Sequence, residues 1–292
     1  MNPKKICICY FSGTGNTELI SQLLSIEFIK QGAKADLIAV EEVLKGKTSI
    51  NVNDYDILGF GHPVHAFSAP RIYFEFIESL PPAEDTPSFY FRTAGDPICN
   101  GGATSMVRRI LQQKGYKIFH ESLIVMPSNV LIQYNDELVK QLFITAKIKI
   151  VKIVTEVLQN KIKLQKNSPM LRIISRLFSR AETLGGKYFG KYLFITDNCN
   201  QCNLCIYKCP TGNIYKNNES GKIKFGEKCT FCLKCVYLCP SKSIKSKYMN
   251  FFILKNGYNI KTVIENPMLK GIYVTETTKG FFKHFYKYIS DV

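Results

Sequence analysis

The sequence has 292 residues and a formal net charge of +16, with 39 Lys and Arg residues against 23 Asp and Glu residues. No apolar run reaches the roughly 18 residues that a transmembrane helix needs, and no secretory signal is visible at the start. Of the eleven cysteines, only three lie outside two regular runs, which excludes a disulfide framework. We therefore expect a soluble, cytoplasmic protein.

The excess positive charge is confined to the second part of the chain. Residues 1–160 carry 16 basic and 16 acidic side chains, whereas residues 161–292 carry 23 basic and 7 acidic ones. This imbalance predicts an acidic partner, a membrane surface or nucleic acid as the binding partner. A lysine-rich surface without a dedicated partner is an equally open alternative.

The chain begins with a pattern that predicts a phosphate site. Residues 6–11 are typical of a buried parallel strand and residues 18–30 of a helix, with a loop of glycines and hydroxyl residues between them. In such an arrangement the loop N–H groups and the helix N-terminus point at an anion. The loop lacks the lysine of a P-loop, so its hydroxyls suit a single terminal phosphate, although such loops also form ordinary strand–helix turns. The predicted phosphate-binding residues are Ser12, Gly13, Thr14, Gly15, Asn16 and Thr17.

Strand and helix patterns continue to alternate, which predicts an α/β fold with a doubly wound, parallel, five-stranded sheet. The further predicted strands are residues 36–40, 55–61, 88–93 and 122–126, and the further helices are residues 71–79, 104–114 and 136–159. Ligands of such sheets lie beyond the carboxyl ends of the strands. The loops after the first, third and fourth strands are therefore the expected walls of the site.

A basic linker, residues 161–168, is followed by an amphipathic helix. Its apolar stripe consists of Met170, Ile173, Ile174, Leu177 and Phe178. We expect this stripe to pack on a neighbouring domain, with a membrane surface as the alternative.

Two cysteine runs of the form C-x2-C-x2-C-x3-C-P follow, beginning at Cys199 and Cys229. In such duplicated runs the fourth cysteine ligates the cluster of the other run. One predicted [4Fe–4S] cluster is bound by Cys199, Cys202, Cys205 and Cys239, and the other by Cys229, Cys232, Cys235 and Cys209. Zinc is the alternative, but zinc needs neither the third cysteine nor the Cys-Pro ending.

The aromatic and basic tail after these runs allows three interpretations: packing, membrane contact or stacking on nucleic acid. It contains no recognised nucleic-acid motif.

The loop from Ser12 to Thr17 resembles the flavodoxin phosphate loop, [ST]-x-T-G-x-T. Together with the cysteine runs, nearly everything up to Lys247 resembles the flavodoxin–ferredoxin fusion proteins sometimes called ferrodoxins. The resemblance implies a flavodoxin-like FMN-binding domain with strand order 2-1-3-4-5 at 1–160. It further implies a linker with an amphipathic helix at 161–189, an α+β two-cluster ferredoxin domain at 190–248, and a C-terminal extension at 249–292.

The resemblance also implies which loops hold the flavin ring. The residues so indicated are Pro63, His65, Phe67, Thr93, Ala94, Gly95, Asn100, Gly101 and Gly102. The chain has no Trp, which flavodoxins often stack on the ring, and only His65 and Phe67 are candidates for stacking in the loop after the third strand. Loose binding of FMN is therefore an open possibility.

These inferences favour an electron-transfer protein that couples FMN to two [4Fe–4S] clusters, with no catalytic residue. An acidic redox protein is the expected partner, docking on the basic half, and peripheral membrane contact is an alternative. A second hypothesis is an FMN-dependent reductase of a small organic acceptor, with His62 or His65 as proton donor. A third, an iron–sulfur regulator that binds nucleic acid, rests only on charge. The clusters and the abundance of Lys, Ile and Asn suggest an anaerobe.

Overall fold

The computed structural model describes residues 2–98, 103–166 and 169–292. Its largest element is a parallel five-stranded sheet with the order β2-β1-β3-β4-β5, which confirms the predicted doubly wound fold. The strands are β1 Lys5–Tyr10, β2 Lys34–Ala39, β3 Ile57–Pro63, β4 Thr86–Ala94 and β5 Tyr116–Val125.

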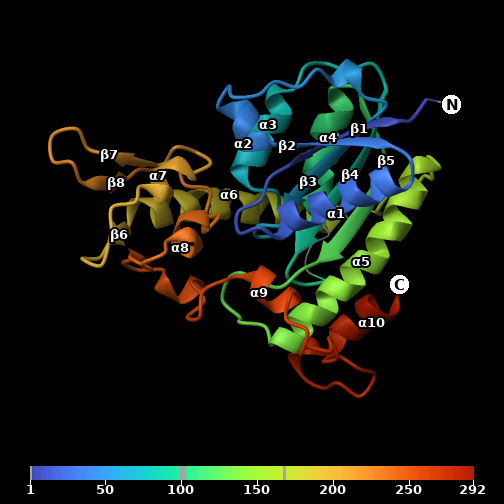
Figure 1. The fold of residues 1–292 in the computed structure, drawn as a ribbon. Helices are drawn as coiled ribbons and strands as arrows, with labels where there is room; N and C mark the ends of the chain where they lie inside the picture. Colours follow the sequence, from blue (N-terminus) through green and yellow to red (C-terminus); the bar gives the residue numbers. More distant parts are fainter. Residues whose placement is uncertain (1, 99–102, 167–168) are drawn as a thin grey trace.

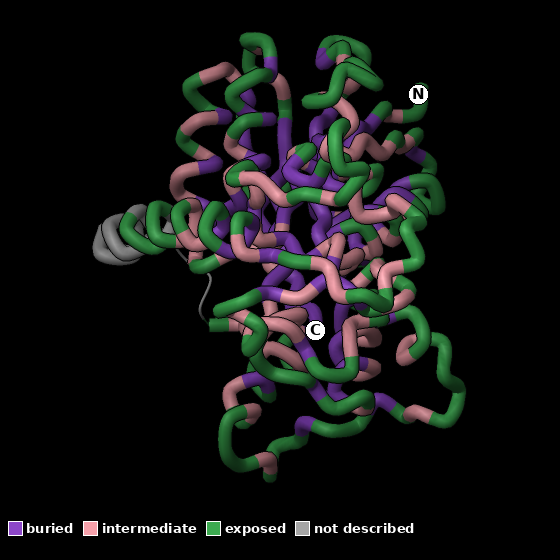
Figure 2. The backbone as a smooth tube through the Cα atoms, turned by 90° about the vertical axis from the view of Figure 1, so that its left-hand side faces the viewer, coloured by how far each residue is buried: buried purple, intermediate pink, exposed green. Residues whose placement is uncertain are grey.

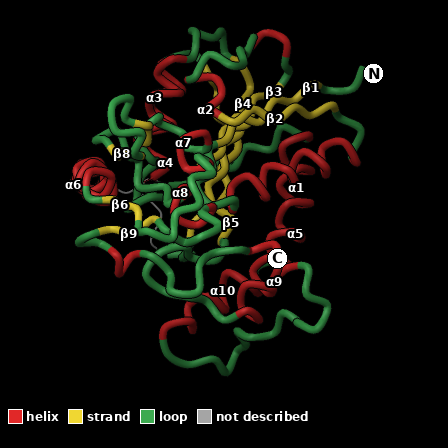
Figure 3. The backbone as a smooth tube through the Cα atoms, turned by 60° about the vertical axis from the view of Figure 1, so that its left-hand side comes forward, coloured by secondary structure: helices red, strands yellow, loops and turns green. Residues whose placement is uncertain are grey.

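Helices cover both faces of this sheet (Figures 1 and 3). The helices of one face are α1 Asn16–Lys30 and α5 Asp136–Leu158, and those of the other are α2 Val40–Leu44, α3 Arg71–Ser79 and α4 Ala103–Gln113. A short 3-10 helix, η1 Val52–Asp54, precedes β3. The buried residues concentrate in the sheet and on the helix surfaces that face it (Figure 2), so the carboxyl ends of the strands are held by a rigid core.

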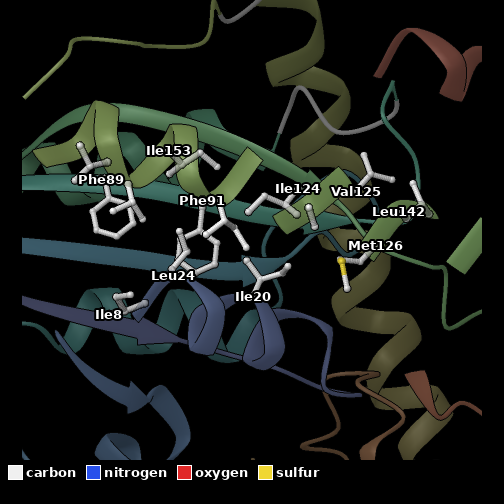
Figure 4. Packing of buried hydrophobic residues seen from close by; sticks show 14 of the residues in the cluster. Ile8, Ile20, Leu24, Phe89, Phe91, Ile124, Val125, Met126, Leu142 and Ile153 are labelled. Atoms are coloured by element: carbon white, nitrogen blue, oxygen red, sulfur yellow. The ribbon is translucent and has the colours of Figure 1, made fainter. Parts of the chain in front are cut away.

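Two glycines of β3 make room for two phenylalanines of β4. Gly59 pairs with Phe89 and Gly61 with Phe91 in the parallel register. A Cβ at Gly59 would lie 2.5 Å from Cζ of Phe89 and 3.2 Å from Ile8. Figure 4 shows Phe89 and Phe91 in the core beside Ile8. The missing side chains therefore allow two aromatic rings to lie flat over the centre of the sheet.

Strand β5 is longer than the predicted 122–126, and the predicted linker is partly an extension of the sheet. Lys163 forms a parallel bridge with His120, and the Glu121 N–H donates to the Lys163 carbonyl at 2.8 Å. The sequence pattern hides this strand because it contains His120 and Glu121. Their burial is possible because Glu156 accepts from His120 at 3.0 Å and Arg108 donates to Glu121 at 3.0 Å.

Helix α6 Pro169–Lys191 carries the chain into a small iron–sulfur-type module. The boundary expected between residues 189 and 190 falls inside this helix. The module contains β6 Leu193–Ile195, α7 Leu204–Tyr207, β7 Ile214–Lys216, β8 Ile223–Phe225, α8 Lys234–Leu238 and β9 Ile244–Ser246. The pairs β6–β9 and β7–β8 form two antiparallel ribbons, and Phe189 of α6 lies in the module's hydrophobic cluster.

The C-terminal extension packs along the flavodoxin-like domain near α5 (Figure 1). It contains η2 Asn250–Phe252, α9 Ile260–Ile264, η3 Phe281–His284 and α10 Phe285–Ser290. Ile260, Val274 and Phe285 are buried in the same cluster as α1 and α5, and the Val125 N–H donates to the Tyr288 hydroxyl at 2.9 Å. These residues of the extension thus complete the core between α1 and α5. No helix among the described residues is long and apolar enough to cross a bilayer.

We predict that Gly59→Ala lowers the thermal unfolding midpoint, because the new methyl group overpacks the Phe89 ring at a cost of about 1–3 kcal/mol. Gly185→Ala on α6 is the matched control, since a Cβ there meets no atom within 4 Å and alanine favours a helix by about 1 kcal/mol. Equal midpoints for Gly59→Ala and the wild type would contradict the packing argument.

Candidate cofactor sites

The predicted phosphate loop lies between β1 and α1 and is held in shape by its own residues. Gly15 has φ +101°, in the left-handed region that favours glycine, and its N–H donates to the Ser12 hydroxyl at 3.2 Å. The Thr17 hydroxyl lies 2.8 Å from the hydroxyl of Thr93 on β4. This bond fixes the first turn of α1 to the end of β4, so the phosphate loop is held in shape without a ligand.

The loop lines a cavity of about 100 Å³, which we call the phosphate cavity. It brings together most of the residues predicted for the flavin, and it adds a loop after β5 that the sequence analysis missed. The lining residues are Ser12, Gly13, Thr14, Asn16, Thr17, Pro63, Val64, His65, Thr93, Ala94, Gly95, Pro127, Ser128, Asn129 and Val130. Backbone N–H groups and hydroxyls at a helix N-terminus suit a phosphate, so the lining fits the terminal phosphate of FMN.

The loop after β5 and the C-terminal extension support the phosphate loop from outside. Asn129 donates to the Thr14 hydroxyl at 2.7 Å, and Asn16 donates to the Pro127 carbonyl at 3.0 Å. Tyr258 of the extension donates to Asn16 Oδ1 at 2.5 Å. The position of residues 127–130 at the carboxyl end of the last strand was the available signal for the loop. Nothing local in the sequence indicates Tyr258.

A second cavity, of about 400 Å³, adjoins the phosphate cavity and shares four lining residues with it: Val64, His65, Asn129 and Val130. We call it the interdomain chamber, because its other walls come from loops of the flavodoxin-like domain, from α6, from the iron–sulfur-type module and from the start of the C-terminal extension. These walls are Ala66, Leu131, Ala181, Glu182, Gly185, Gly186, Phe231, Met249 and Phe252.

The two histidines of the β3 loop have different environments. His62 is fully buried, with its Nδ1 at 2.8 Å from the Pro63 carbonyl and its Nε2 at 2.5 Å from the Tyr90 hydroxyl. Burial lowers the pKa of His62 to about 3, and His62 lines neither of the two cavities; its role as proton donor stays a prediction. His65 lies in the site, with Nδ1 3.4 Å from Oε1 of Glu182.

Two other predictions for the ring loops have different outcomes. Phe67 does not line either cavity; its ring packs 5.0 Å from that of Phe178 on α6. Asn100, Gly101 and Gly102 lie outside the described residues, as does Cys99. Of the apolar stripe on α6, Leu177 and Phe178 are exposed by 62% and 46%, and Phe178 packs on Phe67 rather than on the iron–sulfur-type module.

Four cysteines from both runs surround one small cavity of about 20 Å³: Cys209, Cys229, Cys232 and Cys235. We call them the inner cysteine group. They form the set predicted for one cluster, including the crossed Cys209. Burial raises the pKa of Cys229 to about 12 and that of Cys232 to about 11, so bound cations are needed to keep these thiols deprotonated.

Two orphaned donors also lie at this cavity. Among the described residues, Asn213 Nδ2 and Thr230 Oγ1 are buried side-chain atoms without a hydrogen-bond partner, and both residues line the cavity. Buried polar groups are normally satisfied. Iron–sulfur sulfurs are the acceptors that such donors fit. No three His, Cys, Asp or Glu side chains in the described part of the chain form a group that could hold a single metal ion.

The remaining four cysteines form the outer cysteine group: Cys199, Cys202, Cys205 and Cys239. Cys202 is exposed, in contrast to the buried Cys209 and Cys232. Burial raises the pKa of Cys205, and the nearby Cys239 and Cys199 raise it further. Cys239 therefore lies near Cys205. The assignment of all eight cysteines as cluster ligands stays a prediction.

The two cysteine loops share an unusual backbone. Gln201, Asn203, Phe231 and Leu233 all have φ between +53° and +57°, which is the left-handed region that normally favours glycine. The Gln201 and Phe231 N–H groups each donate to the preceding cysteine sulfur at 3.4 Å. The left-handed backbone costs about 1–3 kcal/mol per residue, and at Gln201 and Phe231 it accompanies an N–H group directed at sulfur.

A scan against protein families matches residues 191–240 to a family described as a 4Fe-4S dicluster domain. A search of curated proteins found no match.

Among solved structures, the similar chains include a flavodoxin of Streptococcus pneumonia TIGR4 (17% identity, 53% of this chain and 98% of that chain, TM-score 0.39). A short-chain flavodoxin associated with a PDU bacterial microcompartment is 12% identical (54% of this chain and 99% of that chain, TM-score 0.40). Rubredoxin oxygen:oxidoreductase of Desulfovibrio gigas is 13% identical over 55% of this chain, which spans 37% of that protein (TM-score 0.37). At these identities and TM-scores the structural similarities carry no argument, so the evidence for the fold remains the strand order of the sheet. The chain joins a flavodoxin-like sheet to a 4Fe–4S dicluster domain, an architecture that fits a flavodoxin–ferredoxin fusion.

Proposed function

We propose that this protein transfers electrons between an FMN in the flavodoxin-like domain and two [4Fe–4S] clusters bound by the inner and outer cysteine groups. When bound, FMN supplies two-electron chemistry and the clusters supply one-electron steps. The observation that carries the proposal is the order of the sites. The phosphate loop lies against Cys232 of the inner cysteine group, and the outer cysteine group reaches solvent at Cys202.

The first step of this order is a direct contact. A Cβ at Gly13 of the phosphate loop would lie 2.5 Å from the Cys232 carbonyl oxygen, so the two loops touch backbone to backbone. Lys45 donates to the Cys209 carbonyl at 2.8 Å, and Lys234 pairs with Glu41 at 2.8 Å. The first of these contacts involves Cys209 of the first cysteine run, and the second involves Lys234 of the second run. They support the inner group as the neighbour of the flavin site.

The protein's own residues hold the inner cysteine group in position and exclude water from it. Phe189, Leu193 and Leu233 are buried around the inner group, and a dry environment lowers the cost of reorganisation when charge moves. Cys202 of the outer group is exposed, and Tyr207 in the helix that follows it, α7, is 72% exposed. We infer that electrons enter or leave the molecule at this surface.

We further propose an acidic redox protein as the partner at this surface. Lys208, Lys242 and Lys247, within or after the two cysteine runs, are exposed, and complementary charge accelerates encounter. The rate constant for reduction of an acidic protein acceptor is then expected to fall about tenfold or more on raising the salt concentration. Lys208→Gln flattens that dependence, whereas Lys30→Gln on α1 leaves it intact. A salt-independent rate would exclude electrostatic docking.

The crossed ligand sets are tested by pairing cysteine substitutions. Wild-type protein prepared without oxygen is expected to contain about eight irons and one FMN per chain. Cys209→Ala with Cys232→Ala damages one predicted cluster and keeps about four irons. Cys239→Ala with Cys232→Ala damages both. Iron assay and EPR of the reduced variants distinguish them, and the reverse result would assign each run to its own cluster.

The orphaned Thr230 hydroxyl predicts a shift in reduction potential. Thr230→Val keeps the shape but removes a donor worth about 0.5–1.5 kcal/mol, so the potential of the inner cluster falls by roughly 20–60 mV. The hydrogen bond is lost chiefly from the reduced, more negative state. Thr155→Val, on α5, is the control. An EPR-monitored redox titration with identical potentials for Thr230→Val and the wild type would contradict this role.

A further inference from the structure

We propose that the isoalloxazine ring of FMN occupies the interdomain chamber, so that α6 and the second cysteine loop form half of the flavin site. This inference rests on the proposed function, because it takes FMN as the ligand. It differs from the expectation that the ring is held by the loops after β3 and β4 alone.

The sizes and the continuity of the two cavities support this position. The phosphate cavity holds about 100 Å³, whereas sites for ligands of this size hold about 300–1,000 Å³. The chamber offers about 400 Å³ more and shares Val64, His65, Asn129 and Val130 with the phosphate cavity. A ligand with a phosphate at one end and a flat ring at the other therefore fits the two cavities together.

The chamber has the chemistry that a flavin ring needs. Phe231 and Phe252 meet edge to face, with centroids 5.1 Å apart, and Phe231 is braced against Phe189 at 4.5 Å. Met249 adds a polarisable sulfur to the same wall. His65 and Glu182 supply polar groups with side chains exposed by only 14% and 7%. An apolar aromatic wall with a few polar groups is typical of a cofactor site.

The described parts of the flavodoxin-like loops do not offer such a wall. Of the described residues that line the two cavities, the only aromatic rings are His65, Phe231 and Phe252. Phe67, the other stacking candidate, packs on Phe178. In a chain without Trp, the aromatic surface for the ring thus comes from the cysteine loop and from the segment that follows the iron–sulfur-type module.

A pair of glycines in the middle of α6 points the same way. Glycine in a helix costs about 1 kcal/mol relative to alanine, so each needs a reason. Gly186 has one, since a Cβ there would lie 2.9 Å from the Cys229 carbonyl oxygen. Gly185 lines the chamber, and a Cβ there would meet no atom within 4 Å. Its small size is not required by the protein, but it keeps the chamber open for a ligand.

With the flavin ring in the interdomain chamber, one wall of its site comes from the second cysteine loop, which carries Cys229, Cys232 and Cys235 of the inner cysteine group. The Phe231 N–H donates to the Cys229 sulfur at 3.4 Å, and Phe231 itself lines the chamber. The same residue therefore contacts both proposed cofactor sites.

The test compares Gly185→Leu with Gly185→Ala in the full-length protein with its clusters intact. FMN affinity is measured from the quenching of flavin fluorescence, with iron content and unfolding midpoint as checks. Leucine fills the chamber and raises the Kd at least about tenfold, whereas alanine, which adds a single methyl group, raises it less. Phe252→Leu is a second variant that touches no cysteine, and we expect it to weaken binding and reduce the visible circular dichroism of bound flavin.

The outcomes separate this inference from the proposed function. If the wild type binds no FMN, the proposed function itself fails. If the wild type binds FMN and both Gly185→Leu and Phe252→Leu bind it equally well, the ring lies outside the chamber and only this inference is overturned. If Gly185→Leu keeps its FMN affinity but loses turnover of a small organic acceptor, the chamber is a substrate pocket, which also overturns it. If Gly185→Leu does not fold, the affinity of Phe252→Leu decides.

Discussion

The backbone of the phosphate loop touches the backbone of the second cysteine loop, and the arrangement of the molecule depends on this contact. Glycine at position 13 is the only residue that fits there, because any Cβ would collide with the Cys232 carbonyl oxygen. The contact joins residues more than two hundred positions apart in the chain. Around it, Tyr237 donates to the Asn129 carbonyl at 2.7 Å and Arg71 donates to the Lys228 carbonyl at 3.0 Å. The two domains are thus packed as one body at the place where both cofactors are expected (Figure 1).

Burial then gives the cysteine groups different properties. The inner group is enclosed by α6 and the flavodoxin-like domain, whereas the outer group reaches the surface at Cys202. Burial away from water opposes the extra negative charge of a reduced cluster, whereas hydrogen-bond donors to its sulfurs favour that charge. The inner site has both a drier setting and the orphaned donors of Asn213 and Thr230. The outer group is instead open to solvent at Cys202. If each group binds a cluster, as we propose, the two clusters are expected to differ in reduction potential.

Local patterns in the sequence predicted much of the fold. The alternation of strands and helices, the helix of residues 71–79 and the long helix α5 were predicted from hydrophobic periodicity, whereas the strand order was implied by the resemblance to flavodoxins. The phosphate loop was predicted because its whole signal lies in six consecutive residues. Strand β5 was predicted too short, because partners from distant segments neutralise its buried polar residues. The chamber was missed for a related reason: Gly185, Phe231 and Phe252 are adjacent only after folding. The role of the C-terminal extension could not be predicted, because aromatic residues form the same sequence pattern whether they stack on a ligand or fill a core.

The central claim is that a flavin site and two cluster sites exchange electrons inside one chain. Stopped-flow absorbance after rapid reduction of the clusters in the FMN-loaded protein tests it most directly. The account predicts that the flavin absorbance decays while the cluster absorbance recovers, at a rate constant that does not change with protein concentration. A rate proportional to protein concentration, or flavin reduction only by the external reductant, would contradict it.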